Sequence, residues 1–177
     1  YWATRAVSLP LRKYWLDIGL EGVANVPETG GVVLAANHLS FLDSMLLMYS
    51  LPRQVSFLGK AEYLAACRTR KLFTAAGMIP VDRSGRGAVK SLRWACKRLD
   101  LGQIVGIFPE GTRSRDGLLH RGHTGVAHLA LRTGAPIVPV GIVGSGVAQP
   151  PGARFPTRGA SVRLRFGSPV DLGRWAG

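Results

Sequence analysis

Short apolar runs alternate with helical stretches along most of the chain. The run GGVVLAAN is apolar at consecutive positions, which predicts a strand buried on both faces of a sheet. The segment from Arg86 to Leu99 has the spacing of an amphipathic helix, and Gly134 follows another helical stretch as a C-cap. We expect strands at 30–37, 54–58, 77–82, 104–108, 136–142 and 161–167, and helices at 41–51, 86–99 and 124–132.

Strands that alternate with helices predict an α/β fold: a single domain with a central mixed β-sheet flanked by helices. A length of 177 residues fits one domain. We place this domain at residues 23–177. Within it, residues 144–159 are rich in Gly and Pro and lack any period, which indicates a long irregular loop. The strand after this loop alternates strictly and carries Arg163 and Arg165 on one face.

The first 22 residues differ from the rest because aromatic and basic side chains are mixed there. Trp and Tyr beside Lys and Arg suit the interface of a membrane, with rings at headgroup depth and cations on lipid phosphate. We therefore expect residues 1–22 to form an N-terminal helical segment that contacts a membrane. Packing of its aromatic rings on the domain is the alternative. The chain starts at Tyr1, which leaves open an anchor further upstream.

The composition narrows the class of protein. Apolar residues make up 46% of the chain and charged residues 19%, which excludes a disordered chain. The net charge of +13 points to a polyanionic partner: nucleic acid, an anionic membrane surface or a phosphorylated substrate. Two cysteines exclude a disulfide scaffold and a Cys-rich zinc module, and they fit a reducing compartment.

A histidine and an aspartate follow the first buried strand. Ser40 and Asp43 have the S-x-x-D spacing of a capping box, so Asp43 could simply cap the next helix, and His38 could bond to backbone. Inside one helix, residues five apart lie about 140° apart at ~100° per residue and cannot pair. If the helix starts at Ser40, the imidazole can fold back onto Asp43 as a His–Asp dyad. The spacing leaves both readings open.

A second polar block, Phe108 to Ser114, follows the strand at 104–108. Gly111 would let the backbone approach a ligand closely. Arg113 offers a planar fork of donors that suits a phosphate group. An ordinary surface turn is the alternative for this block taken alone.

Together with two further blocks, these segments resemble the glycerolipid acyltransferases, specifically the bacterial 1-acylglycerol-3-phosphate acyltransferase family. The resemblance extends from about Val23 to Val143. Its four blocks are N-H-x-x-x-x-D at Asn37, His38 and Asp43; G-x-I-x-x-x-R at Gly77, Ile79 and Arg83; F-P-E-G-T-R from Phe108 to Arg113; and V-P-V at Val138, Pro139 and Val140.

The resemblance implies transfer of an acyl group from acyl-CoA or acyl-carrier protein to the free hydroxyl of 1-acylglycerol 3-phosphate (lysophosphatidic acid), which gives phosphatidic acid. It implies His38 as the general base and Asp43 as the residue that orients it. No serine or cysteine nucleophile is needed, and the sequence holds no G-x-S-x-G elbow. It implies no cofactor, and a location on the cytoplasmic face of the cell membrane, as a peripheral protein on anionic lipid.

The resemblance also implies residues that bind the acceptor. By this resemblance Lys60, Arg83 and Arg113 bind the acceptor phosphate. Glu110 organises Gly111 and Arg113 or contacts the glycerol. The substrate-binding set is Lys60, Arg83, Glu110, Gly111, Thr112 and Arg113. Phe41, Met45 and Met48 could line the acyl chain, although Met and Phe at helical spacing are more often core.

The segment HRGHTGVAHLAL departs from the family. His123 and His128 stand where relatives often carry Lys and Arg, so donor binding could be weaker or dependent on pH. Together with His120 they suggest a possible metal site. The spacing offers no obvious fourth ligand, so we expect no metal to bind there.

Other functions compete with this interpretation. The acceptor could instead be glycerol 3-phosphate or another lysophospholipid, and His38 could activate water in a thioesterase. The charge of +13 also raises a nucleic-acid-binding module. We expect no nucleic-acid partner, because the sequence has no aromatic RNA-binding block, zinc-finger spacing or basic helix run.

Overall fold

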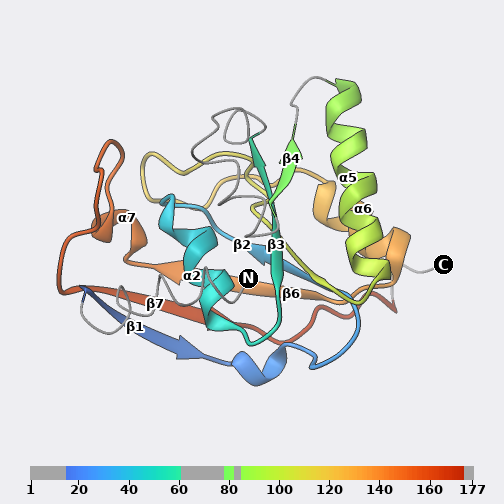
Figure 1. The fold of residues 1–177 in the computed structure, drawn as a ribbon, viewed down its shortest axis with the longest axis horizontal. Coiled ribbons are helices and arrows are strands. Elements are labelled where there is room, and N and C mark those ends of the chain that lie inside the picture. Colours follow the sequence, from blue (N-terminus) through green and yellow to red (C-terminus); the bar gives the residue numbers. More distant parts are fainter. Residues whose placement is uncertain (1–14, 61–77, 82–84, 174–177) are drawn as a thin grey trace.

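Figure 1 presents a computed structural model of the chain, which describes residues 15–60, 78–81 and 85–173. Strands and helices alternate along it as the apolar pattern predicts. The elements are β1 (Leu16–Glu21), η2 (Val23–Asn25), β2 (Val32–Ala36), α2 (Leu42–Ser50), β3 (Val55–Lys60), β4 (Ile79–Val81), α5 (Gly85–Asp100), β5 (Ile104–Ile107), α6 (Gly125–Thr133), β6 (Ile137–Val143), α7 (Ser145–Ala148) and β7 (Ala160–Phe166).

The described strands form one mixed sheet in the order β1-β7-β6-β2-β5-β3-β4. The strands from β6 to β4 are parallel, while β7 runs antiparallel to β6 and β1 runs parallel to β7. The carboxyl ends of β6, β2, β5, β3 and β4 therefore share one edge of the sheet, which we call the carboxyl edge. Open α/β sheets place their ligand sites at such an edge.

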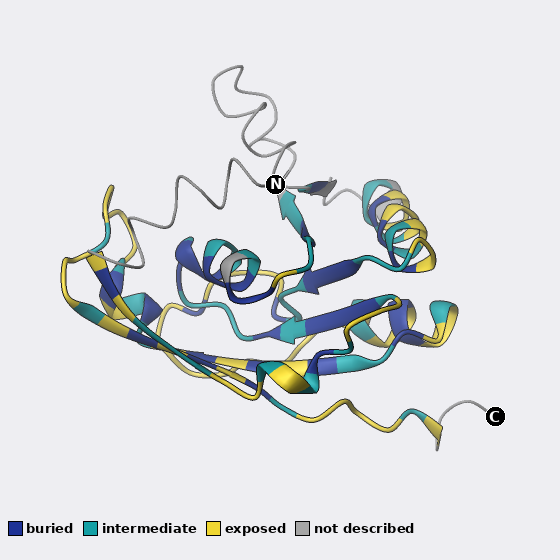
Figure 2. Cartoon of the chain, turned by 60° about the horizontal axis from the view of Figure 1, so that its bottom comes forward, coloured by how far each residue is buried: buried dark blue, intermediate teal, exposed yellow. Residues whose placement is uncertain are grey.

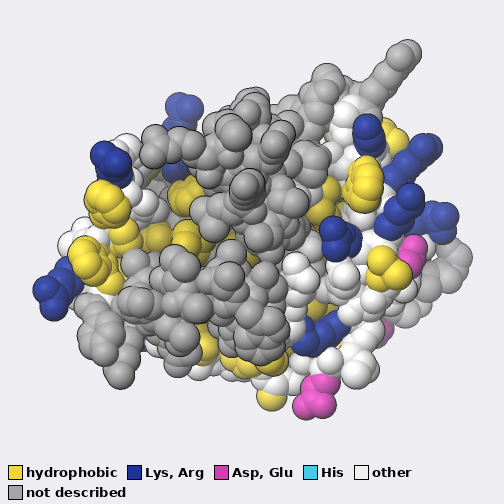
Figure 3. All heavy atoms as spheres, in the orientation of Figure 1, with side chains coloured by type: hydrophobic (Ala, Val, Ile, Leu, Met, Phe, Trp, Pro, Cys, Tyr) yellow, Lys and Arg dark blue, Asp and Glu magenta, His cyan; other side chains and the backbone are white. Residues whose placement is uncertain are grey.

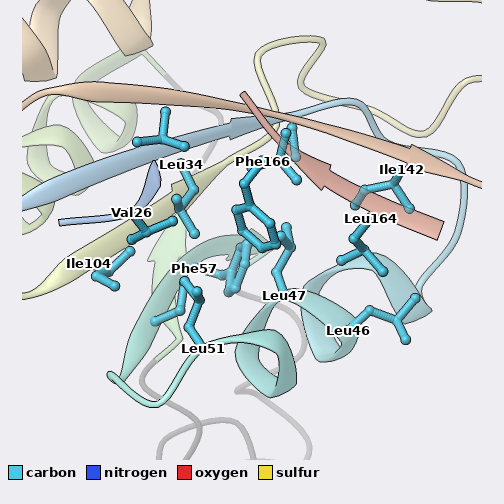
Figure 4. Close-up of a cluster of buried hydrophobic side chains, with 14 of the residues drawn as sticks. Val26, Leu34, Leu46, Leu47, Leu51, Phe57, Ile104, Ile142, Leu164 and Phe166 are labelled. Carbon is cyan, nitrogen blue, oxygen red and sulfur yellow. The ribbon is translucent and has the colours of Figure 1, made fainter. Parts of the chain in front are cut away.

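Helices cover both faces of this sheet, as expected for the fold class. On one face, α2 packs over side chains from β2, β3, β6 and β7, with Leu47, Phe57 and Phe166 close together (Figure 4). On the other face, α5 and α6 cover Val33 and Val105. Because β2 sends Val32, Leu34 and Ala36 to one cluster and Val33 to the other, this strand is buried on both faces, as its unbroken apolar run predicts.

The predicted N-terminal helical segment is wrong for Leu16–Glu21. These residues form the edge strand β1, whose register with β7 pairs Leu16 with Ala160 and Glu21 with Arg165. Gly19 leaves room for the Arg163 side chain, which a Cβ there would meet at 2.4 Å. The sheet therefore begins before residue 23. Residues 1–14, which carry the rest of the predicted membrane-contact segment, lie outside the described residues.

The segment 144–159 also differs from its prediction in one respect. It contains a single helical turn, α7, which follows Gly144 at φ 87. The backbone N–H groups of Ala148 and Gln149 donate to Gly144 and Ser145, so the turn closes on itself. Four residues are too few to give a readable period. No described helix is long or apolar enough to cross a bilayer.

Candidate active site

The turn after β2 is fixed by a side chain that acts like backbone. The Asn37 amide donates to the carbonyl of Ile142 at 2.9 Å, and its Oδ1 accepts the Ile142 N–H at 2.7 Å. This pair of bonds continues the ladder between β2 and β6 beyond the end of β2. It places His38, the next residue, at the carboxyl edge of the sheet.

His38 and Asp43 are in contact, as one of the two sequence interpretations predicts. His38 Nδ1 lies 2.9 Å from Asp43 Oδ2. The contact is possible because α2 begins at Leu42, so His38 lies in the turn before the helix and can fold back over it. An ionised carboxylate only accepts hydrogen bonds, so Nδ1 carries the proton and Nε2 keeps its lone pair.

Asp43 is fully buried, and its position is fixed by backbone donors. Oδ2 accepts the N–H groups of Leu39 at 2.7 Å and Ser40 at 2.8 Å, in addition to the imidazole. Among the described residues, Oδ1 has no hydrogen-bond partner. The side chain of Asp43 is 0% exposed and that of His38 is 19% exposed, so the dyad opens to solvent only through the imidazole.

Only half of the predicted capping box forms. Asp43 reaches back to the Ser40 N–H, whereas the Ser40 hydroxyl accepts from the Leu42 N–H at 3.3 Å and not from the Asp43 N–H that a capping box would use. The same hydroxyl donates to the Gln149 carbonyl at 3.1 Å and so joins the turn to the loop after α7. The Asp43 carboxylate serves the helix start and the imidazole together, so the two interpretations of this residue are compatible.

Phe108 belongs to the candidate site through its ring, a role that the sequence pattern did not predict. Its ring stacks on the His38 imidazole, with centroids 3.9 Å apart and planes 11° from parallel. Phe57 stacks on the other end of this column, with ring centroids 5.6 Å apart. The sequence contains a signal for this contact, because the block with His38 directly follows β2 and the block with Phe108 directly follows β5. The register of β2 with β5 pairs Ala35 with Ile107, which brings the residues after each strand together.

Glu110 ties the two blocks together through backbone donors. Its Oε1 accepts the His38 N–H at 3.2 Å, and its Oε2 accepts the His120 N–H at 3.0 Å. The Ser114 N–H donates to the His38 carbonyl at 2.7 Å, which adds a second link. Glu110 is buried, so losing these donors would leave an unpaired carboxylate away from water.

The other residues of the F-P-E-G-T-R block face solvent. Gly111 has φ +69, a left-handed conformation that glycine adopts without strain, and a Cβ there would meet the His123 ring at 3.2 Å. Thr112 and Arg113 are exposed beside it. Arg113 therefore projects from the same carboxyl edge as the dyad.

The structure brings the backbone of Lys60, another of the predicted phosphate ligands, to this edge. Lys60 ends β3 and pairs in register with Val81 of β4, which precedes Arg83 by two residues. Arg83 and the side chain of Lys60 lie outside the described part of the chain, so their convergence with Arg113 stays a prediction.

The histidines of the following loop have separate surroundings. His120 Nε2 lies 2.8 Å from Asp116 Oδ1. Hydrogen bonds from the Leu118 N–H, His120 and Ser114 hold the pKa of Asp116 well below its usual range. His123 and His128 are exposed. No group of three or more His, Cys, Asp or Glu side chains in the described ranges is placed to hold a metal ion.

Of the three candidates for lining an acyl chain, Met48 packs against the buried cluster under α2. Phe41 and Met45 are half-buried. The core interpretation therefore describes Met48 better than the lining one.

Comparisons with known proteins agree with the geometry. A family model described as Acyltransferase matches residues 17–143. The chain is 32% identical over 155 residues to the chloroplastic 1-acyl-sn-glycerol-3-phosphate acyltransferase LPAT1 of Arabidopsis thaliana, covering 86% of this chain and 43% of that protein. It is 32% identical over 126 residues to the 1-acyl-sn-glycerol-3-phosphate acyltransferase of Borreliella burgdorferi, covering 71% of this chain and 50% of that protein.

A solved structure gives the same result for the fold. The crystal structure of the 1-acyl-sn-glycerophosphate (LPA) acyltransferase PlsC from Thermotoga maritima superposes with a TM-score of 0.75 at 28% identity, covering 91% of this chain and 64% of that one. The chain spans about half the length of the curated relatives described above.

Proposed function

The chain belongs to the acyltransferase family, as the four sequence blocks predict, and on that premise we propose that it acylates the free hydroxyl of 1-acylglycerol 3-phosphate to give phosphatidic acid. The acyl donor is a thioester, acyl-CoA or acyl-carrier protein. The observation that carries the proposal is the contact between His38 Nδ1 and Asp43 Oδ2 at 2.9 Å, which leaves Nε2 as the nitrogen available to a substrate.

His38 acts as the general base of this reaction. As the acceptor oxygen attacks the thioester carbonyl, its proton moves to His38 Nε2 and a C–O bond forms. The tetrahedral intermediate then collapses, the C–S bond breaks, and the imidazolium returns the proton to the leaving sulfur. General acid–base catalysis of this kind contributes roughly 10²–10⁴-fold, and positioning of the two substrates supplies further acceleration.

Two neighbours favour the imidazolium that forms during the reaction. The Asp43 carboxylate lies against Nδ1 and is fixed by two backbone donors, so it needs no rearrangement when the charge appears. The face of Phe108 lies 3.9 Å from the imidazole, where an aromatic ring attracts a cation by roughly 0.5–2 kcal/mol. Both contacts also keep the ring from turning.

The acceptor phosphate binds at the carboxyl edge beside the dyad. Arg113 carries it there with a bidentate fork, together with Lys60 and Arg83. Gly111 and Thr112 shape the turn that presents Arg113, and Glu110 holds this turn against His38. This assignment rests on Arg113 being exposed next to a buried, fixed loop.

The carboxyl edge also faces the membrane that holds the acceptor. Two loops flank the His38 turn: residues 108–124, joined to it by Ser114, and residues 144–159, which include α7 and are joined to it by Gln149. Each presents large apolar side chains to solvent, Leu118 (65% exposed) and Leu119 (78%) in the first, Val147 (78%) and Phe155 (68%) in the second. Exposed arginines lie among them: Arg113, Arg115, Arg121, Arg154 and Arg158.

Apolar tips flanked by arginines suit the headgroup region of an anionic bilayer. We place the protein as a peripheral protein on the cytoplasmic face of the cell membrane, with these two loops in contact with lipid. A lysophospholipid can then present its phosphate and hydroxyl to the site while its acyl chain stays in the bilayer.

An acceptor panel tests the proposal. Purified protein is given radiolabelled palmitoyl-CoA or palmitoyl-carrier protein with lysophosphatidic acid, glycerol 3-phosphate or lysophosphatidylcholine, and products are separated by chromatography. We expect labelled phosphatidic acid, with the highest kcat/KM for lysophosphatidic acid. Release of free palmitate at the same rate with and without an acceptor would instead identify a thioesterase.

A further inference from the structure

A basic face runs along α5, on the side of the sheet opposite α2. It consists of Val89, Lys90, Arg93, Trp94 and Lys97, whose spacing places them on one side of the helix. All five are exposed, and Trp94 is 50% and Val89 53% exposed. Figure 3 shows Lys and Arg side chains gathered beside α5, and Figure 2 shows exposed positions along the outer side of this helix.

The cations of this face are not used by the fold. The ion pairs among the described residues lie elsewhere, and none joins Lys90, Arg93 or Lys97 to a carboxylate. Lys97 Nζ lies 5.6 Å from the centroid of the Trp94 ring. Burial of α5 against the sheet depends on the opposite side of the helix, through Ala95 and Leu99. Within the described part of the chain, the packing of α5 does not require the basic face.

A half-exposed tryptophan among cations that no described carboxylate neutralises is typical of a protein-binding surface. Trp and Arg dominate the energetic centres of interfaces, because they bury a large area and can pair with a charged partner. The occupant must carry negative charge that complements three adjacent cations. An acidic helix or acidic small protein fits this chemistry.

The position of α5 favours a protein over a bilayer as this occupant. α5 connects β4 to β5, which both run parallel to β3, so it starts at the carboxyl edge and runs back toward the opposite edge. Its 16 residues span roughly 24 Å at 1.5 Å per residue. With the carboxyl edge against the membrane, the basic face extends away from lipid and is accessible from the aqueous phase.

We propose that the basic face of α5 docks an acidic carrier protein that delivers the acyl thioester to the site. The inference rests on the proposed function, since it names the partner that supplies the donor. The start of α5 lies at the same edge as His38, so a carrier on this face can extend its long thioester arm over that edge. The carboxyl edge remains free for the acceptor and the bilayer.

Charge reversal on α5 tests the proposal. Arg93→Glu and the double variant Arg93→Glu/Lys97→Glu are compared with the parent protein, using palmitoyl-carrier protein and palmitoyl-CoA as alternative donors to lysophosphatidic acid. We expect kcat/KM for the carrier donor to fall roughly tenfold in the single variant and further in the double variant, with the effect decreasing as salt rises. The value for palmitoyl-CoA should change less than twofold.

Arg165→Glu is the matched control, because it reverses the same charge on a side chain that is 82% exposed and lies on β7. It should leave both donors unaffected. Trp94→Ser tests the apolar part of the face and should weaken carrier binding, measured by titration calorimetry, without changing the circular dichroism spectrum.

Three outcomes would overturn the proposal. If kcat/KM falls equally with palmitoyl-carrier protein and palmitoyl-CoA, α5 is part of a site that serves both donors. Loss of binding to phosphatidylglycerol vesicles, with carrier kinetics unchanged, would identify a bilayer as the occupant. Unchanged carrier kinetics in every α5 variant would leave the face without this partner. Failure of the proposed function is distinguishable, because the parent protein would then transfer palmitate from neither donor.

Discussion

Asp43 Oδ2 makes two kinds of contact: it accepts backbone N–H groups in the turn before α2, and it contacts the His38 imidazole. Asparagine can still accept from the Leu39 and Ser40 N–H groups, so the turn should persist. Its amide is a poorer partner for an imidazolium than a carboxylate. We expect Asp43→Asn to lower kcat roughly 10²–10⁴-fold with KM for lysophosphatidic acid little changed. Steady-state kinetics with a circular dichroism check would measure this, and near-normal kcat would show that the carboxylate is only a cap.

Phe108 acts on the orientation of the same ring. Phe108→Leu keeps an apolar side chain but removes the flat face that stacks on His38 at 3.9 Å. We expect kcat to fall about tenfold, in line with ~1.4 kcal/mol of lost positioning. Phe108→Tyr keeps the ring and serves as the control. An equal fall in both variants would mean that the hydroxyl disturbs the site or that stacking is irrelevant.

Among the secondary-structure elements, Arg53 connects the turn before β3 to the segments that precede β2 and β5, on the edge opposite the site. Its guanidinium donates to the carbonyls of Pro27, Gly30 and Gly102, which precede β2 and β5. Arg53 is half-buried, and this partial removal of its charge from water lowers the pKa of the side chain. This side chain therefore holds the starts of neighbouring strands in register.

Arg53→Gln should lower the free energy of unfolding by about 1–3 kcal/mol, because a shorter amide cannot reach all three carbonyls. Urea denaturation would measure it. Arg165→Gln is the control and should cost less than about 0.5 kcal/mol, since among the described residues Arg165 pairs with Glu21 in a long, exposed contact. If Arg53→Gln lowers the free energy of unfolding no more than the control does, the Arg53 contacts do not stabilise the fold.

The elements near the site could be predicted because their signals are local. β2 is an unbroken apolar run, Gly134 ends α6 with φ 69, and α5 has a clear amphipathic period. β1 was missed because its strand character depends on pairing with β7, which lies far along the chain. The hydrogen bonds that Glu110 accepts could not be predicted either, because their donors are the backbone N–H groups of His38 and His120.

At the scale of the whole molecule, charge and apolar side chains separate into distinct surfaces. The two loops at the carboxyl edge combine apolar tips with arginines, while α5 carries cations with one tryptophan on a helix that runs away from that edge. We therefore expect the positive charge of +13 to favour two partners, anionic lipid at the carboxyl edge and an acidic donor protein on the basic face of α5.

Membrane contact through the first loop has a direct test. Leu118→Ser/Leu119→Ser removes two exposed side chains, which contribute nothing to the buried clusters, and should leave folding intact. We expect partitioning to phosphatidylglycerol vesicles to fall roughly tenfold or more, because each buried leucine contributes about 1.5–3 kcal/mol. Cosedimentation would measure it, with Leu101→Ser as an equally exposed control on the turn after α5.

If the control and the loop variant partition alike, the loop does not enter lipid. If only the loop variant is impaired, its activity toward a water-soluble short-chain acceptor should remain, since the dyad is unchanged. Loss of that activity as well would place the two leucines in the site rather than at the bilayer.

The proposed reaction depends on His38 removing the proton of the acceptor hydroxyl. The most direct measurement is the rate of labelled palmitate transfer to lysophosphatidic acid by His38→Ala, in single turnover with saturating donor and acceptor. We expect this rate to fall roughly 10²–10⁴-fold in a protein that still folds. Transfer by this variant at the parental rate would contradict it.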